Sequence, residues 1–166
     1  MDKNKVVLIG PMGVGKSTLG NRAAELLDWK YLDNDLDMAK STGITVEALS
    51  KRSVEELHKL EAEFILKVIA SDAPFIAGAA ASVIENLEVQ SALKDINTIY
   101  LYIALDQIYS RTGAGTVGRQ AINDETDIIK ERFERRDPLY RKYAKHVLNL
   151  SENPKRDTER LIALIQ

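Results

Sequence analysis

The stretch Gly10–Ser17, which reads GPMGVGKS, decides the fold of this chain of 166 residues. It fits the pattern G-x-x-x-x-G-K-S of a phosphate-binding loop. A short apolar run, Val6–Ile9, comes directly before it, and a segment of helical composition, Ser17–Leu27, follows it. A glycine-rich turn with a chance lysine would not need this order of strand, loop and helix, which is the context that supports the motif. The sequence therefore predicts that the chain binds a nucleoside triphosphate.

Each residue type in this loop suits a phosphate ligand for its own physical reason. Glycines let the backbone curl so that its N–H groups point at phosphate oxygens. The helix that starts near Lys16 adds the positive end of its dipole. The Lys16 ammonium can reach the β- and γ-phosphates, and the Ser17 hydroxyl can ligate Mg²⁺. The nucleotide-binding residues predicted in the loop are Gly10, Met12, Gly13, Val14, Gly15, Lys16, Ser17 and Thr18.

The rest of the chain alternates short apolar runs with longer helical patterns. Pro74–Ala77 and Ile99–Ile103 have the length and composition of buried strands, whereas Val54–Ala70 and Asp127–Arg136 have helical spacing, and a last helix starts near Arg156. This alternation predicts an α/β fold with a parallel sheet covered by helices on both faces, in one domain that spans residues 1–166. Ligands of such sheets bind at the carboxyl ends of the strands.

Composition and charge narrow the class of protein. The 23 basic and 25 acidic residues give a net charge of −2, so neither nucleic acid nor an anionic membrane is an expected partner. The chain has no cysteine, and its apolar run at Val6–Ile9 is too short for a signal peptide or a membrane span, so we expect a soluble, cytoplasmic protein. It shows neither the guanine-reading Asn-Lys-x-Asp segment of a GTPase nor the acidic strand end of a motor ATPase. A small-molecule kinase fits best.

Two carboxylates follow the loop at a short distance, in Tyr31–Asp35 (YLDND). If this stretch is extended, Asp33 and Asp35 point to the same side. Asp33 could then hold Mg²⁺ together with Ser17, and Asp35 could orient an attacking hydroxyl or accept its proton. The alternative is a solvated acidic turn, since Asp and Asn favour turns.

These motifs resemble the shikimate kinase family, from Val6 to about Ile165. Gly10–Gly20 is similar to that family's nucleotide loop, and Tyr31–Asp35 to its substrate and magnesium segment. Gly43–Leu49 and Leu57–Glu61 stand in the place of its substrate-covering helices. The resemblance implies a three-layer P-loop kinase fold with about five parallel strands.

The second half of the chain resembles the family's lid and its substrate and adenine contacts. Arg111-Thr112-Gly113 is similar to the start of a lid, about residues 111–123, whose arginine lies against adenine. Arg136–Tyr140 (RDPLY) is similar to the segment whose arginine pairs with the substrate carboxylate, and Asn153-Pro154 to a turn that closes on adenine. The resemblance implies adenine contacts by Arg111 and Pro154. It also implies that the lid arginine, Arg119, stabilises the charge that develops during transfer.

The sequence departs from the family on the acceptor side. Gly78–Ala81 replaces a triple glycine, so we expect added methyl groups to crowd the pocket and alanine to resist any positive φ. Leu57-His58 replaces a Phe-Arg pair, and an imidazole cannot form the bidentate fork of arginine. His58 could equally be a surface histidine. The predicted acceptor-binding residues are Asp35, His58, Gly78, Ala79, Ala80 and Arg136.

We therefore predict an ATP-dependent phosphotransferase that moves the γ-phosphoryl group to a hydroxyl of a small molecule, either shikimate or a related acceptor. The predicted catalytic residues are Lys16, Asp35 and Arg119, and Ser17 and Asp33 are the predicted Mg²⁺ ligands. We expect a monomer with weakened or altered recognition of shikimate. Two alternatives remain open: a nucleoside, nucleotide or sugar kinase, and a nucleotide-binding regulatory protein without transferase activity.

Overall fold

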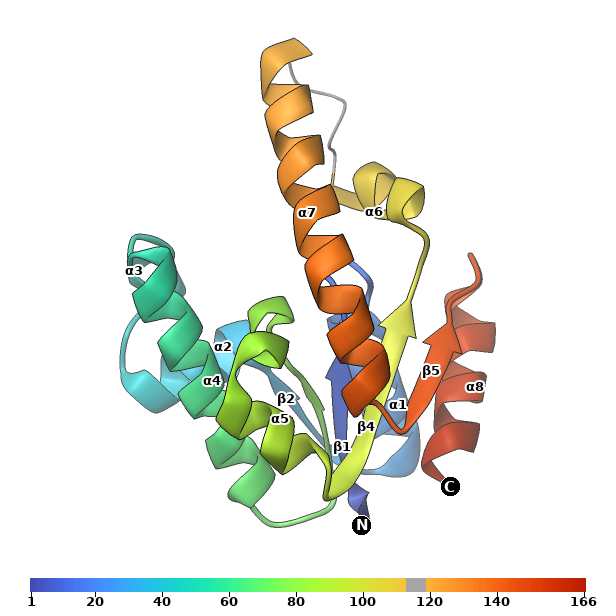
Figure 1. Cartoon of the computed structure of the whole chain (residues 1–166). Coiled ribbons are helices and arrows are strands. Elements are labelled where there is room, and N and C mark those ends of the chain that lie inside the picture. The colour runs from blue at the N-terminus through green and yellow to red at the C-terminus, as the bar shows by residue number, and fades with distance from the viewer. Residues whose placement is uncertain (113–118) are drawn as a thin grey trace.

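The structure is a computed structural model. It describes the backbone of residues 1–112 and 119–166, and it describes the side chains of all residues except 112–125. Strands and helices alternate along the chain (Figure 1). In order they are β1 (Asp2–Ile9), α1 (Lys16–Leu27), β2 (Lys30–Asp33), α2 (Asn34–Thr42), α3 (Val46–Ser50), α4 (Val54–Ala70), β3 (Phe75–Gly78), the 3-10 helix η1 (Ala81–Glu85), α5 (Leu87–Leu93), β4 (Ile96–Tyr102), α6 (Leu105–Thr112), α7 (Arg119–Tyr143), β5 (His146–Asn149) and α8 (Pro154–Ile165).

The strands form one parallel sheet in the order β2-β3-β1-β4-β5. The register places Leu8 of β1 and Asp33 of β2 on either side of Gly78 in β3. The loops that follow these three strands therefore leave the sheet at the same level and meet at its carboxyl edge. This arrangement confirms the predicted α/β fold with a central parallel sheet of five strands.

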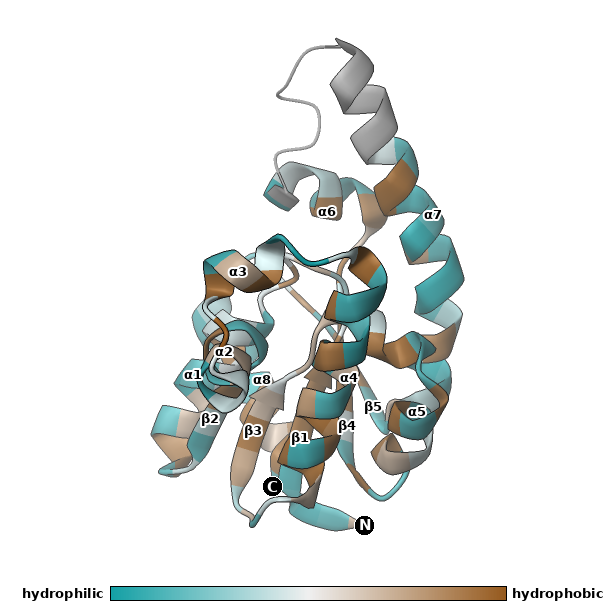
Figure 2. Ribbon diagram, turned by 90° about the vertical axis from the view of Figure 1, so that its left-hand side faces the viewer, coloured by the Kyte–Doolittle hydropathy of each residue, from teal (hydrophilic) through white to brown (hydrophobic). Residues whose placement is uncertain are grey.

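Alternate residues of the central strand β1 face two separate apolar layers, because side chains point to opposite sides along a strand. Val6 and Leu8 are packed with residues of α1 and α8, whereas Val7 and Ile9 are packed with residues of α2, α4, α5 and the end of α7. Figure 1 shows the helices on both sides of the sheet, and Figure 2 shows apolar residues gathered along the strands and the inward sides of the helices. Since both faces are covered, the central strands are continuous apolar runs.

Helix α7 is longer than the predicted segment Asp127–Arg136 and continues past Pro138 to Tyr143. A proline inside a helix removes one backbone hydrogen bond, so other contacts must hold the final turns. The buried Tyr140 ring lies 4.8 Å from the Tyr100 ring, centre to centre, and its hydroxyl donates to the Ala81 carbonyl over 2.7 Å. These contacts fix the end of α7 against β4 and η1, which explains why the helix does not stop at the proline.

Within the described part of the chain, no helix is both long and apolar enough to cross a membrane.

Candidate active site

The predicted phosphate loop and the predicted acidic pair line one cleft of ≈ 410 Å³ at the carboxyl ends of β1, β2 and β3. The wall contributed by the loop contains Lys16, Ser17 and Thr18. The opposite walls come from the start of α2, from α4 and from the segment after β3. The residues on these walls are Asp33, Asn34, Asp35, Glu61, Gly78, Ala79, Ala80 and Ala81.

The shape of the phosphate loop depends on its glycines. Gly10 has a φ of 146°, and a Cβ at this position would lie 2.8 Å from the carbonyl oxygen of Leu101 in β4. Gly15, the residue that precedes α1, has a φ of 106°. Because L-residues rarely adopt such angles, both positions require glycine. Met12 is exposed, whereas the buried Val14 anchors the loop to the apolar layer beneath α1.

Lys16 begins α1 and points back into the loop, where its ammonium donates to the carbonyls of Gly10 over 2.7 Å and Pro11 over 2.8 Å. Burial lowers the pKa of Lys16 to about 7. The nearby carboxylates of Asp35 and Glu61 oppose this shift, and the positive charge of Arg136 adds to it. The loop therefore holds a lysine whose charge depends on whether an anion is close to it.

Asp33 joins the phosphate loop to the acidic segment. Its Oδ1 accepts a hydrogen bond from the Ser17 hydroxyl over 3.1 Å, and its Oδ2 accepts one from the backbone N–H of Leu36 over 3.1 Å. Asp33 ends β2 and caps α2, so the segment is not extended as predicted: Asp35 lies in the first turn of α2. Both carboxylates still line the cleft, because the helix begins at its edge.

The hydroxyl of Ser17 and the carboxylate of Asp33 are suitable ligands for Mg²⁺. Mg²⁺ in kinases is held by one or two protein oxygens together with phosphate oxygens and water. A cage of protein ligands is not required. The described residues contain no cluster of three or more histidine, cysteine or acidic side chains that could hold a metal. The site thus fits a magnesium ion that arrives with a nucleotide.

Glu61 and Asn34 also line the cleft, although neither is among the predicted site residues. Glu61 accepts hydrogen bonds from the Ser82 hydroxyl over 3.2 Å and from the Asn34 amide over 3.3 Å, and this amide also donates to Asp35. Burial raises the pKa of Glu61, although these two hydrogen bonds oppose the shift. Glu61 follows Leu57 by four residues, so both lie on the same, inward face of α4. This spacing is the one sequence signal that separates Glu61 from the charged residues on the outer face of the helix.

The segment after β3 has no residue with a positive φ. Ala80 has a φ of −60°, and Asp28 is the one residue other than glycine with a positive φ in the described chain, so Gly78–Ala81 carries no such strain. The Ala79 N–H continues the sheet by donating to the Leu8 carbonyl over 3.0 Å. Gly78 is needed for another reason: a Cβ there would lie 2.6 Å from the Tyr31 hydroxyl.

Arg136 and His58, two of the predicted acceptor-binding residues, do not line the ≈ 410 Å³ cleft. Arg136 is buried on α7, and it lines a second, more apolar cleft of ≈ 280 Å³ that shares Met12 and Ala81 with the first. His58 is half-buried on α4. Burial lowers its pKa, and the positive charges of Arg136 and Arg132 lower it further, which favours the uncharged imidazole.

Comparison with known proteins agrees with this geometry. The family profile described as shikimate kinase matches residues 12–166. The chain belongs to the shikimate kinase family. A shikimate kinase of Rhodococcus jostii is 31% identical over 162 residues, which cover 96% of each chain.

Solved structures show the same fold. A shikimate kinase from Acinetobacter baumannii, solved in complex with shikimate, superposes with a TM-score of 0.82 at 24% identity, covering 97% of this chain and 92% of that one. The enzyme from Aquifex aeolicus gives a TM-score of 0.80 at 22% identity, covering 97% of this chain and 95% of the other. The prediction of an ATP-dependent, shikimate kinase-like phosphotransferase is confirmed at the level of the family.

Arg111 and Pro154, the two predicted adenine contacts, do not line the ≈ 410 Å³ cleft. Arg111 of α6 donates from Nη1 to the Val14 carbonyl over 2.8 Å, so it lies against the phosphate loop, and its contact with adenine stays a prediction. Pro154 is exposed at the first position of α8. The predicted lid, about 111–123, lies largely outside the described residues, and so does the side chain of Arg119.

Proposed function

We propose that this chain transfers the γ-phosphoryl group of ATP to a hydroxyl of a small acceptor, shikimate or a related molecule, within the ≈ 410 Å³ cleft. The observation that supports this proposal most strongly is the placement of Lys16 and Asp35 in the walls of that cleft. A phosphate-neutralising cation and a carboxylate that can orient a hydroxyl are the two groups that direct phosphoryl transfer needs.

On the nucleotide side, the loop N–H groups and Lys16 would bind the phosphates, and Ser17 and Asp33 would hold Mg²⁺. Mg²⁺ would supply further positive charge to the β- and γ-phosphates. Because the transferred group passes through a state in which charge is spread over its oxygens, catalysis consists mainly of positioning and charge neutralisation. We also propose that Arg119 adds a second cation at this stage, and that Arg111 and Pro154 contact adenine.

On the acceptor side, Asp35 would accept a hydrogen bond from the attacking hydroxyl. The hydroxyl oxygen bonds to the γ-phosphorus, the bond from this phosphorus to the bridging oxygen breaks, and ADP leaves. The hydroxyl proton passes to Asp35 or to solvent. Asn34 holds Asp35 and Glu61 through its amide, over 3.3 Å in each case, and so fixes the wall against which the acceptor lies.

We propose that shikimate itself binds weakly. A neutral His58 forms no charge-assisted contact, and hydrogen bonds to charged groups contribute about 1.5–3 kcal/mol each. The methyl groups of Ala79 and Ala80 add to the cleft wall. Calorimetric titration of shikimate in the presence of ADP and Mg²⁺ is the test. The combined variant His58→Arg, Ala79→Gly and Ala80→Gly should bind shikimate more tightly, whereas micromolar binding by the unmodified protein would contradict this account.

A panel of acceptors tests the activity and separates the alternatives. The protein is incubated with ATP, Mg²⁺ and hydroxylated acids, polyols, sugars or nucleosides, and phosphorylated products are identified by mass spectrometry. Transfer to shikimate or to a related hydroxylated acid or polyol supports the proposal. Transfer confined to nucleosides, nucleotides or sugars would assign another kinase class, and nucleotide binding without any product would indicate a regulatory protein.

A further inference from the structure

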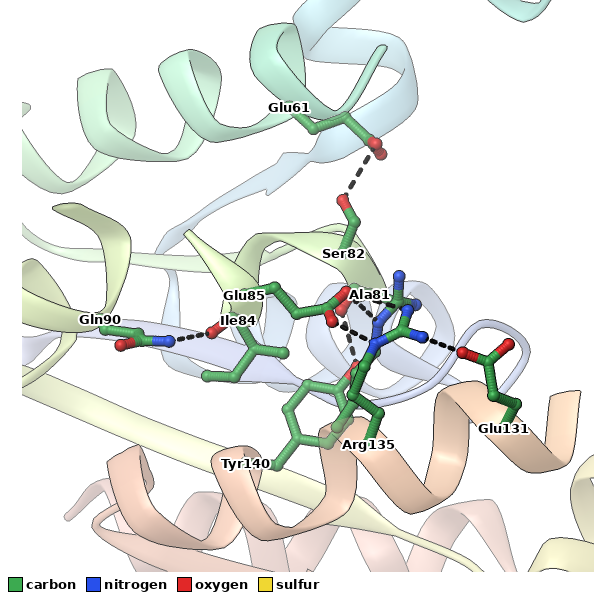
Figure 3. Close-up of polar contacts among 10 residues, drawn as sticks. Glu61, Ala81, Ser82, Ile84, Glu85, Gln90, Glu131, Arg135 and Tyr140 are labelled. Carbon is green, nitrogen blue, oxygen red and sulfur yellow. Dashed lines mark hydrogen bonds and ion pairs between the residues drawn. The ribbon is translucent and has the colours of Figure 1, made fainter. Parts of the chain in front are cut away.

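Arg136, the predicted acceptor-binding arginine, is already paired with a carboxylate of the protein, in a cluster of ion pairs between η1 and α7. Glu85, at the end of η1, accepts a hydrogen bond from Nε of Arg136 over 2.9 Å. It also pairs with Arg135, which in turn pairs with Glu131 (Figure 3). The Arg136 side chain is only 7% exposed, so water does little to weaken this contact.

The charge of Glu85 is retained in this position. Burial alone would raise the pKa of Glu85, but hydrogen bonds from Arg135 and Arg136 outweigh it and hold the pKa below its usual value. An arginine recognises a carboxylate through two parallel N–H groups of its fork. The Nε of Arg136 is already used by a carboxylate of the protein, and the charge of Arg136 is compensated before any ligand arrives.

The remaining groups around the acceptor do not replace this cation. The lowered pKa of His58 favours its uncharged form. Arg132, one turn earlier on α7, lines the ≈ 280 Å³ cleft together with Arg136, but its side chain is exposed, so water screens its charge. Lys16 is the one basic residue among the described residues that line the ≈ 410 Å³ cleft, and it belongs to the phosphate loop. Three acidic residues line the same cleft, Asp33, Asp35 and Glu61.

The hydrogen-bonding chemistry of this wall favours donors. Ionised carboxylates only accept hydrogen bonds. Hydroxyl groups of a polyol can donate to Asp35 and Glu61, whereas a ligand carboxylate has no hydrogen to donate and adds a like charge. Neighbouring charges of the same sign are an effective way for a site to reject a ligand.

We propose that Glu85 takes the place of an acceptor carboxylate on Arg136, so that the site selects an uncharged, hydroxyl-rich acceptor over one that carries a carboxylate. Glu85 is then a specificity-determining residue that acts through Arg136. This inference rests on the proposed function, because it describes the acceptor of that reaction.

A matched pair of ligands tests the inference: shikimate and its primary carboxamide, which differ in one charge. Each is titrated by calorimetry into the protein with ADP and Mg²⁺ present. We expect the unmodified protein to bind the carboxylate at least about tenfold more weakly than the amide. Equal binding, or tighter binding of the carboxylate, would overturn the inference without any variant.

The variant Glu85→Gln keeps the size of the side chain and removes its charge. It should bind shikimate at least about tenfold more tightly than the unmodified protein, with little change for the amide. Glu131→Gln is the matched control, because it removes a charge from the same cluster but leaves the contact between Glu85 and Arg136. If Glu85→Gln leaves the affinity for shikimate within threefold of the original, including no detectable binding by either protein, the inference is wrong.

Failure of the proposed function gives a different result. Phosphoryl transfer is measured separately on the same samples, by the appearance of a phosphorylated acceptor. If no acceptor is phosphorylated, the proposed function fails, while the effect of Glu85→Gln on ligand affinity still decides whether Glu85 excludes a carboxylate.

Discussion

Nucleotide binding should draw a proton onto Lys16. Burial lowers the pKa of Lys16 to about 7 in the free protein. Phosphate oxygens beside the ammonium favour its charged form, so the pKa rises again in the complex. At pH 8, about one-tenth of the free protein has a charged Lys16, so binding should take up about 0.9 protons. At pH 6 the uptake by Lys16 should fall to about 0.1.

The coupling of nucleotide binding to proton uptake also sets how nucleotide affinity changes with pH. Above pH 7 the free protein must bind a proton before the ammonium can pair with phosphate, so affinity should fall as pH rises, approaching about tenfold per pH unit. Below pH 7 Lys16 is already charged, and this dependence disappears. The terminal phosphate of ADP, with a pKa of about 6, is deprotonated at pH 8 and contributes little there.

Calorimetry of ADP and Mg²⁺ binding at pH 8, in buffers with different heats of ionisation, measures the proton uptake directly. Lys16→Met is the control, since it keeps much of the side-chain volume and removes the titrating group. A binding enthalpy that is the same in every buffer, or an uptake that persists in Lys16→Met, would refute the reasoning about this lysine.

Three further outcomes follow from individual contacts. Gly78→Ala should lower stability by about 1–3 kcal/mol, because the new Cβ meets the Tyr31 hydroxyl at 2.6 Å, and the loss should shrink in a Tyr31→Phe background. Denaturant unfolding of the four proteins checks this, and equal losses in both backgrounds would exclude the contact as the cause. Tyr140→Phe should cost about 1–2 kcal/mol by leaving the Ala81 carbonyl without its donor, which lowers Tm by about 2–8 °C, and an unchanged Tm would show that this bond does not anchor α7. Lys16→Ala should reduce phosphoryl transfer at least about 100-fold while the protein stays folded, and normal turnover would contradict the role of the loop.

The parts of the fold that depend on local sequence were predictable. The phosphate loop is set by glycines whose backbone angles few other residues adopt, and the bounds of α4 match the predicted segment Val54–Ala70. The passage of α7 through Pro138 was not predictable from local preference. It depends on contacts of Tyr140 with β4 and η1, which are distant in sequence.

The candidate site also has one side that local sequence predicts and one side that depends on contacts between distant residues. Its nucleotide side follows from one continuous motif, whereas its acceptor side is assembled from α2, α4, η1 and α7. Glu85 and Arg136 are 51 positions apart, and no spacing rule connects them. The sequence predicts Asp35 in an extended segment, whereas the structure places it in the first turn of α2. Asp35 still lines the cleft, because Asp33 caps that helix at the edge of the sheet.

We propose above that the cleft transfers the γ-phosphoryl group of ATP to a small hydroxylated acceptor. The most direct measurement is the formation of phosphorylated acceptor and ADP in equal amounts, by unmodified protein, by Lys16→Ala and by Lys3→Ala, whose lysine is exposed on β1 near the opposite end of the strand from the phosphate loop. We predict stoichiometric product with the unmodified protein and Lys3→Ala, and at least about 100-fold less with Lys16→Ala. ADP and Mg²⁺ binding without phosphorylation of any acid, polyol, sugar or nucleoside would contradict the claim.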